Sequence, residues 1–154
     1  MRSYATSVDE PAEVLASAVD AAIGPWVERA VARIMVAYAS EVPPEVAADA
    51  RQAGEAATAA VGVELRRLLA LDAERQPTNP LSILRAAVRY PTAVLQRAGV
   101  PPVVRDEFRE RAFPDDVYDL APASWRDVDE ALHEPGIIWG AWKAKTVLDR
   151  RHPA

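Results

Sequence analysis

The uneven distribution of proline is the sequence feature that most constrains how this chain can fold. Residues 77 to 154 contain nine of the 13 prolines, and residues 1 to 76 contain the other four. Proline lacks a backbone N–H, and its ring clashes with the preceding helical turn, so each proline limits where a helix can run. The pattern predicts long helices in the first half and short, proline-bounded helices in the second.

Two helices are expected before residue 41. Apolar residues recur there at the three- and four-residue spacing of a helix with one buried face. We predict one helix from about residue 9 to residue 23 and another from residue 25 to residue 40. The Gly24-Pro25 pair should separate them, because both residues disfavour a helix interior.

A third, longer helix is expected to begin after Pro43-Pro44 and to run to about residue 73. It contains no further proline, and we expect it to bend at Gly54 or Gly62, or to project and find a partner. Its small apolar residues would let a neighbouring helix approach closely. Packing within the chain is the favoured interpretation, and a homodimer through this long helix is the alternative. The expected seam consists of Val46, Ala50, Ala53, Ala57, Val61, Leu65 and Leu68.

After residue 76, prolines and capping residues mark several short helices. Asn79 can cap a helix that begins at Pro80 and breaks at Tyr90-Pro91, and a second covers residues 91 to 98 and closes on Gly99. We expect further helices over residues 101 to 114, 124 to 133 and 135 to 150.

These elements predict an all-α fold. It comprises an N-terminal bundle of about three helices, one of them long, with several short proline-bounded helices packed on it. At 154 residues the chain fits a single domain, with subregions 1–76 and 77–154. It contains no cysteine, which fits a reducing compartment and makes the cytoplasm the expected location. We expect no export signal and no membrane span.

Arginines and acidic residues alternate in blocks along the second half. Residues 77 to 105 hold four arginines and no acid, and residues 106 to 134 hold ten acids. Arg85 and Arg89 lie four residues apart, so both guanidinium groups can face one carboxylate or anion. We expect these arginines to pair with the acidic block. Nucleic-acid binding through them is the least favoured alternative, because the net charge is −5 and no aromatic residues are interleaved.

The acidic block also contains the residues that could hold a metal ion. Glu130 and His133 have the i, i+3 spacing at which a carboxylate and an imidazole can share one ion. Asp115 and Asp116 could add oxygen ligands. The competing interpretation, which we favour, is that the aspartates cap a turn after Pro114 and that His133 ends a helix.

Catalytic motifs are missing from the sequence. No GxSxG, GxGxxG or Walker loop occurs, and two histidines leave few choices for a general base. We therefore lean against an enzyme and predict no cofactor.

The last expected helix combines a row of small residues with two tryptophans. Gly136, Gly140 and Ala144 are spaced four residues apart, which lets another helix come close, and Trp139 and Trp142 lie beside them. We expect both tryptophans to anchor the core. Either would become a candidate contact for a partner protein if it were exposed.

The stretch Phe113-Pro-Asp-Asp-Val-Tyr-Asp-Leu-Ala-Pro122, with the Trp125 to Trp142 segment, resembles small uncharacterised helical proteins of actinobacteria. The resemblance covers the second half and implies no activity and no site residues.

The sequence thus favours a non-enzymatic cytosolic helical protein that binds another protein or regulates it. The proposed contact residues are Arg85, Arg89, Tyr118 and Trp125, because Trp, Tyr and Arg dominate protein interfaces. A metal-binding module or metal-dependent enzyme is the alternative from another class.

Overall fold

The computed structural model describes residues 3–70, 79–102 and 116–151, and every regular element in them is helical. The predicted all-α class is therefore confirmed. The elements are α1 (Ser3–Ala39), α2 (Pro44–Ala70), α3 (Leu81–Ala86), α4 (Arg89–Arg97), α5 (Trp125–Val128), the 3₁₀ helix η1 (Glu130–Leu132) and α6 (His133–Arg151).

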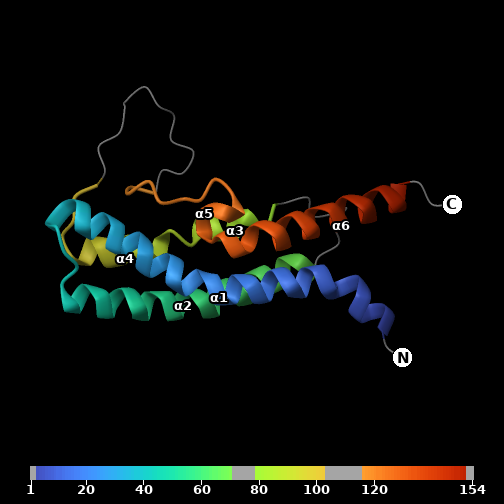
Figure 1. The fold of residues 1–154 in the computed structure, drawn as a ribbon, viewed down its shortest axis with the longest axis horizontal. Coiled ribbons are helices and arrows are strands. Elements are labelled where there is room, and N and C mark those ends of the chain that lie inside the picture. Colours follow the sequence, from blue (N-terminus) through green and yellow to red (C-terminus); the bar gives the residue numbers. More distant parts are fainter. Residues whose placement is uncertain (1–2, 71–78, 103–115, 152–154) are drawn as a thin grey trace, which may run out of the picture.

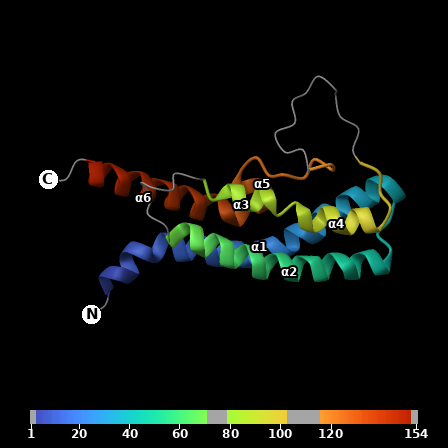
Figure 2. The ribbon, with the colours of Figure 1, turned by 180° about the vertical axis from the view of Figure 1, so that it is seen from behind.

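The two long helices, α1 and α2, lie side by side and form the base of the molecule (Figures 1 and 2). The shorter helices pack on this pair. α4 contacts both long helices near the turn that joins them, and α6 lies along the first part of α1 (Figure 1). The beginning of α1 and the end of α6 reach the same end of the molecule.

The predicted break at Gly24-Pro25 is wrong, because α1 runs unbroken through Pro25. A proline inside a helix leaves the carbonyl four residues earlier without its hydrogen bond. Here that carbonyl belongs to Ala21, which is exposed like Pro25, so water can bond to it. The buried stripe meanwhile continues across the proline through Ile23, Trp26 and Val27. Burial of that stripe outweighs the local cost, and the described residues of the first half form two helices rather than three.

The predicted seam of α2 packs within the chain, as favoured. Gly54 is buried against Gly24, and a Cβ on Gly54 would lie 3.0 Å from the Gly24 carbonyl oxygen and 3.2 Å from its Cα. The backbones of α1 and α2 therefore touch at this crossing. α2 runs without interruption from Pro44 to Ala70, past both glycines at which a bend was expected.

The hydrophobic core lies between the long pair and the shorter helices. Trp26, Leu65, Leu95 and Leu132 come from four different elements and are each at most 6% exposed. Both sequence halves therefore contribute to one core.

The boundary between α3 and α4 lies earlier than expected. Pro91 falls in the first turn of α4, where backbone N–H groups have no intrahelical partner, so it breaks nothing. The expected cap is present, because the Asn79 side chain accepts a hydrogen bond from the Leu81 N–H at 3.0 Å. Gly99 has a φ of +79° and ends α4, as predicted.

Two other capping expectations came out differently. His133 begins α6 instead of ending a helix, so the predicted favourable charge at a helix C-terminus is wrong. At the start of α5, Asp127 accepts a hydrogen bond from the Ala123 N–H, one residue before the Ser124 N–H expected for a capping box. The helix predicted after Pro101-Pro102 lies almost wholly outside the described residues.

No helix in the described residues is both long enough and apolar enough to span a membrane.

Candidate interaction surface

The two proposed contact arginines both hold elements of the chain together. Arg85 donates from Nε to the Pro122 carbonyl at 3.0 Å and from a terminal nitrogen to the Ala123 carbonyl at 3.2 Å. These bonds tie α3 to the segment that precedes α5. Arg89 forms an ion pair with Glu64 of α2 at 3.1 Å, and its guanidinium lies 4.8 Å from the centre of the Tyr90 ring.

In the described residues, Arg89 and Arg97 pair with acids outside the acidic block. Arg89 pairs with Glu64, and Arg97 forms a two-fold contact with Asp49 at 2.8 and 2.9 Å. Both carboxylates belong to α2, on which α4 packs. For Arg89 and Arg97 the expected pairing with the acidic block is therefore wrong, and both arginines are engaged without nucleic acid.

Tyr118 is an internal anchor. Its side chain is 2% exposed, and its hydroxyl donates to the Val100 carbonyl at 2.6 Å. Loss of solvation by burial raises the pKa of the phenol above its ordinary value. The ring therefore cannot reach a partner in this conformation, and it fastens residues 116–122 to the end of α4.

Trp125 packs on the start of α6. A Cβ on Gly136 would lie 2.4 Å from the Trp125 Cδ1 atom, so the indole occupies the space that a side chain at position 136 would need. The half-buried indole thus packs inside the molecule against Gly136, the first residue of the small-residue row. The four proposed contact residues do not form a common free surface.

The proposed metal ligands that the structure describes do not come together at one site. Asp116 is 3% exposed, and its carboxylate accepts hydrogen bonds from the Leu120 and Ala121 N–H groups at 2.8 Å each, which is the predicted turn-capping role. Glu130 is bound to Arg126 at 3.1 Å. His133 is half-buried at the start of α6, and Asp115 lies outside the described residues. In the described part, no three residues with metal-binding side chains come together, and the metal alternative stays a prediction.

An open pocket of about 420 Å³ lies between the start of α1 and the end of α2. Its one basic side chain, Arg66, is bound to Asp20 at 2.8 Å and to Glu13 at 3.4 Å. These contacts raise the pKa of the guanidinium, chiefly through the hydrogen bond to Asp20. The arginine is already neutralised, and the remaining lining consists of small and aliphatic residues.

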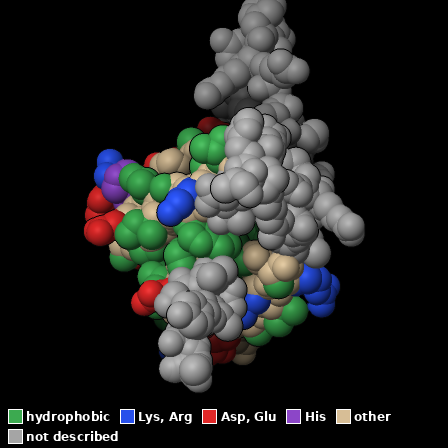
Figure 3. Space-filling view, turned by 90° about the vertical axis from the view of Figure 1, so that its right-hand side faces the viewer, with side chains coloured by type: hydrophobic (Ala, Val, Ile, Leu, Met, Phe, Trp, Pro, Cys, Tyr) green, Lys and Arg blue, Asp and Glu red, His purple; other side chains and the backbone are tan. Residues whose placement is uncertain are grey.

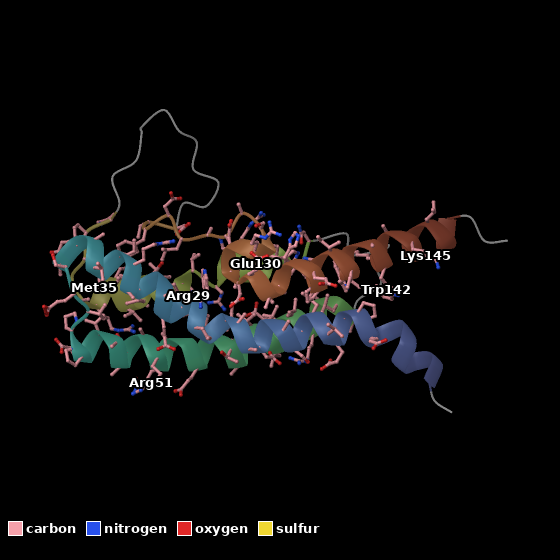
Figure 4. All side chains as sticks on the ribbon, in the orientation of Figure 1. Arg29, Met35, Arg51, Glu130, Trp142 and Lys145 are labelled. Carbon is pink, nitrogen blue, oxygen red and sulfur yellow. The ribbon has the colours of Figure 1, made fainter. Side chains whose placement is uncertain are left out.

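The surface that sequence reasoning did not identify is the outer side of α6. Its inner side is packed: Trp139 is 8% exposed, Trp142 is half-buried and points toward α1, and Lys143 lies 4.9 Å from the Trp139 ring centre (Figure 4). On the outer side, Ile137 is 55% exposed and Leu148 is 56% exposed.

These outer residues form a line along the helix, which we call the outer stripe. It consists of Ile137, Ala141, Ala144 and Leu148, all exposed, with the exposed Ile138 at its flank. Seen along the long axis, hydrophobic side chains gather on the end of the molecule to which α6 extends (Figure 3). In the sequence, the stripe appears only as apolar residues at steps of four, three and four, and this spacing predicts a buried helix face equally well.

Elsewhere the exposed large apolar side chains are dispersed. The described part contains seven of them, and α6 carries three. The other four are spread over α1 and α2, and isolated exposed apolar residues are normal on protein surfaces. A contiguous exposed group marks a site of association more often.

No protein-family model, curated protein or solved structure matches this chain. The resemblance to small actinobacterial helical proteins stays a prediction.

Proposed function

We propose that this chain is a protein-interaction protein whose docking surface is the outer stripe of α6. The stripe supersedes the contact residues expected from the sequence, because those side chains are engaged inside the molecule. A cytosolic, non-enzymatic role remains part of the proposal and depends on the sequence arguments alone.

The observation that carries the proposal is the contrast between the two sides of α6. The inner side buries Trp139 and Gly136, whereas the outer side exposes Ile137 and Leu148 to more than half of their area. Each such side chain gains on the order of 1 kcal/mol or more when it leaves water, since burial contributes about 25 cal/mol per Å². A helix that presents apolar residues at this spacing fits the groove or helix of another protein.

The test compares proteins captured by the immobilised chain and by an Ile137→Glu variant. Glutamate is a good helix former, and position 137 is exposed, so the fold should persist while the stripe acquires a charge. We expect the proteins retained by the wild-type chain to be lost from the variant, as measured by quantitative mass spectrometry.

Val63→Glu is the matched control, because Val63 is 58% exposed on α2, away from the stripe. Its captured set should equal that of the wild-type chain. Equal retention by the wild-type chain and both variants would contradict the proposed docking surface.

A further inference from the structure

We infer that the outer stripe of α6 binds the same stripe of a second copy of this chain, with the two helices antiparallel. This inference rests on the proposed function and names the partner of that surface. It is carried by three features of α6: the spacing of its apolar residues, an unfilled position at Gly140, and the placement of its exposed charges.

The spacing of the stripe keeps its residues on one side of α6. From Ile137 the steps to Ala141, Ala144 and Leu148 are four, three and four residues, an average close to one helical turn. All four positions are exposed. No helix in the described ranges covers these positions. In a pair that crosses near residue 139, Ile137 and Ala141 of the two copies face one another, and Leu148 extends past the start of the other copy's α6.

Gly140 provides the second feature. A Cβ added there would meet no atom within 4 Å, whereas the other helical glycines (Gly24, Gly54, Gly62 and Gly136) each face an atom of the chain. Glycine destabilises a helix interior relative to alanine, and none of the residues that the structure describes uses the space that Gly140 leaves. Together with Ala141 it forms a shallow site beside the stripe, into which Ile137 of a second copy fits when the two helices cross near residue 139.

The exposed charges select the antiparallel orientation. Glu134 and Lys145 are exposed on the same flank of the stripe, because eleven residues correspond to about three helical turns. They are about 16 Å apart along one helix and cannot pair within the chain. In an antiparallel pair centred near residue 139, Glu134 of each copy lies opposite Lys145 of the other. A parallel pair would oppose like charges, and antiparallel helix dipoles also attract.

The size of the surface indicates a weak complex. A helix pair of about four turns buries less than the ~1,000 Å² of a typical stable interface. We therefore expect a reversible dimer with a dissociation constant on the order of 10 μM or weaker.

The test is sedimentation equilibrium of the full chain over a concentration series at low salt. The wild-type chain should change from monomer to dimer. Glu134→Lys and Lys145→Glu should each raise the dissociation constant about tenfold or more, because each opposes two pairs of like charges. The double variant Glu134→Lys/Lys145→Glu restores both pairs with the signs exchanged and should dimerise like the wild-type chain. Circular dichroism of each variant checks that the helices persist.

The orientation has its own readout, because the chain contains no cysteine. A mixture of Glu134→Cys and Lys145→Cys chains should form a mixed disulfide dimer under mild oxidation, and neither variant alone should do so. Cross-linking of each variant with itself, or failure of the double charge variant to restore dimerisation, would overturn the antiparallel pairing.

The outcomes separate this inference from the proposed function. A wild-type chain that stays monomeric at millimolar concentration overturns self-association, while loss of captured proteins on Ile137→Glu would still support docking by the same surface. A dimer that Ile137→Glu leaves intact would overturn the inference and place the contact elsewhere.

Discussion

α2 and α6 both carry rows of small residues, but only the row of α2 is filled by its own chain. On α2, Gly54 meets the backbone of α1 at Gly24. On α6, Gly136 is filled by the Trp125 ring, whereas Gly140, one turn later, faces open space. The same spacing therefore serves an internal contact in one helix and, over its last part, an unoccupied surface in the other.

The difference shows what a row of small residues specifies. It fixes how closely another helix can approach, since no Cβ keeps the backbones apart. It does not fix whether that helix belongs to the same chain. The deciding factor is the geometry of the rest of the molecule: α1 covers α2 along its length, but it covers α6 on one side only (Figures 1 and 4).

The largest expected effect is at the filled row. Gly54→Val should lower the free energy of unfolding by about 3 kcal/mol, because its Cβ would lie 3.0 Å from the Gly24 carbonyl oxygen and backbone atoms cannot move aside. Denaturant unfolding followed by circular dichroism measures this change.

Gly140→Val is the matched control in the unfilled row. The monomer should tolerate it within about 0.5 kcal/mol, since valine suits a helix at least as well as glycine. Equal destabilisation by the two substitutions would show that the small-residue rows of α2 and α6 do not differ in how they are packed.

The next effect tests whether the aromatic residues of the second half serve as internal anchors. Tyr118→Phe removes the hydroxyl bond to the Val100 carbonyl and should lower the free energy of unfolding by about 1 kcal/mol near neutral pH. A loss of that size would mark the phenol as structural.

Tyr118 also predicts a pH dependence. Burial raises its pKa in the folded state above the unfolded value, so both states keep the proton below about pH 10. Above that pH the unfolded state loses the proton first, and stability falls as the pH rises toward the folded-state pKa. The phenylalanine variant should show a shallower alkaline decline in the same unfolding measurement. A decline as steep as that of the wild-type chain would assign the effect to other groups.

Much of the fold could be predicted from the sequence because helical periodicity and capping act locally. Asn79 and Gly99 mark helix ends by hydrogen bonding and by a positive φ, and both predictions are confirmed. The predicted helix break at Pro25 is wrong because the proline costs less free energy than is gained by burying a stripe that continues on both sides of it. A rule based on neighbouring residues alone cannot compare the cost of the proline with the gain from burial.

The interaction surface could not be predicted in the same way. Arg89 and Tyr118 have the chemistry of interface residues, but the same chemistry anchors loops and helices inside a protein. Their internal roles depend on Glu64 and Val100, which are distant in sequence. Exposure of Ile137 likewise follows from the fact that α1 covers only one side of α6, which the spacing of α6 does not reveal.

A comparable effect is expected at the contact that positions α6. Arg29 of α1 donates to the Val128 carbonyl at 2.7 Å and lies 3.9 Å from the Asp129 carboxylate, just before η1 and α6 (Figure 4). Its side chain is about half exposed, so Arg29→Ala should cost about 1 kcal/mol. Arg33→Ala, an exposed arginine one turn further along α1, is the control and should change the free energy of unfolding by less. Thermal unfolding of the two variants distinguishes them, and equal losses would show that the contact at Val128 does not hold α6 in place.

The smallest expected effect separates the two roles of α6 at a single position. Gly140→Ala should raise the free energy of unfolding of the monomer by about 0.5–1 kcal/mol, because alanine favours the helix and its Cβ meets nothing within 4 Å. The same methyl group would occupy the space into which Ile137 of a second copy fits, so the variant should dimerise more weakly. Calorimetry at low concentration measures the gain in stability, and sedimentation at high concentration measures the loss of dimer. A variant that is more stable and dimerises at least as well as the wild-type chain would show that the open space at Gly140 is not part of the contact.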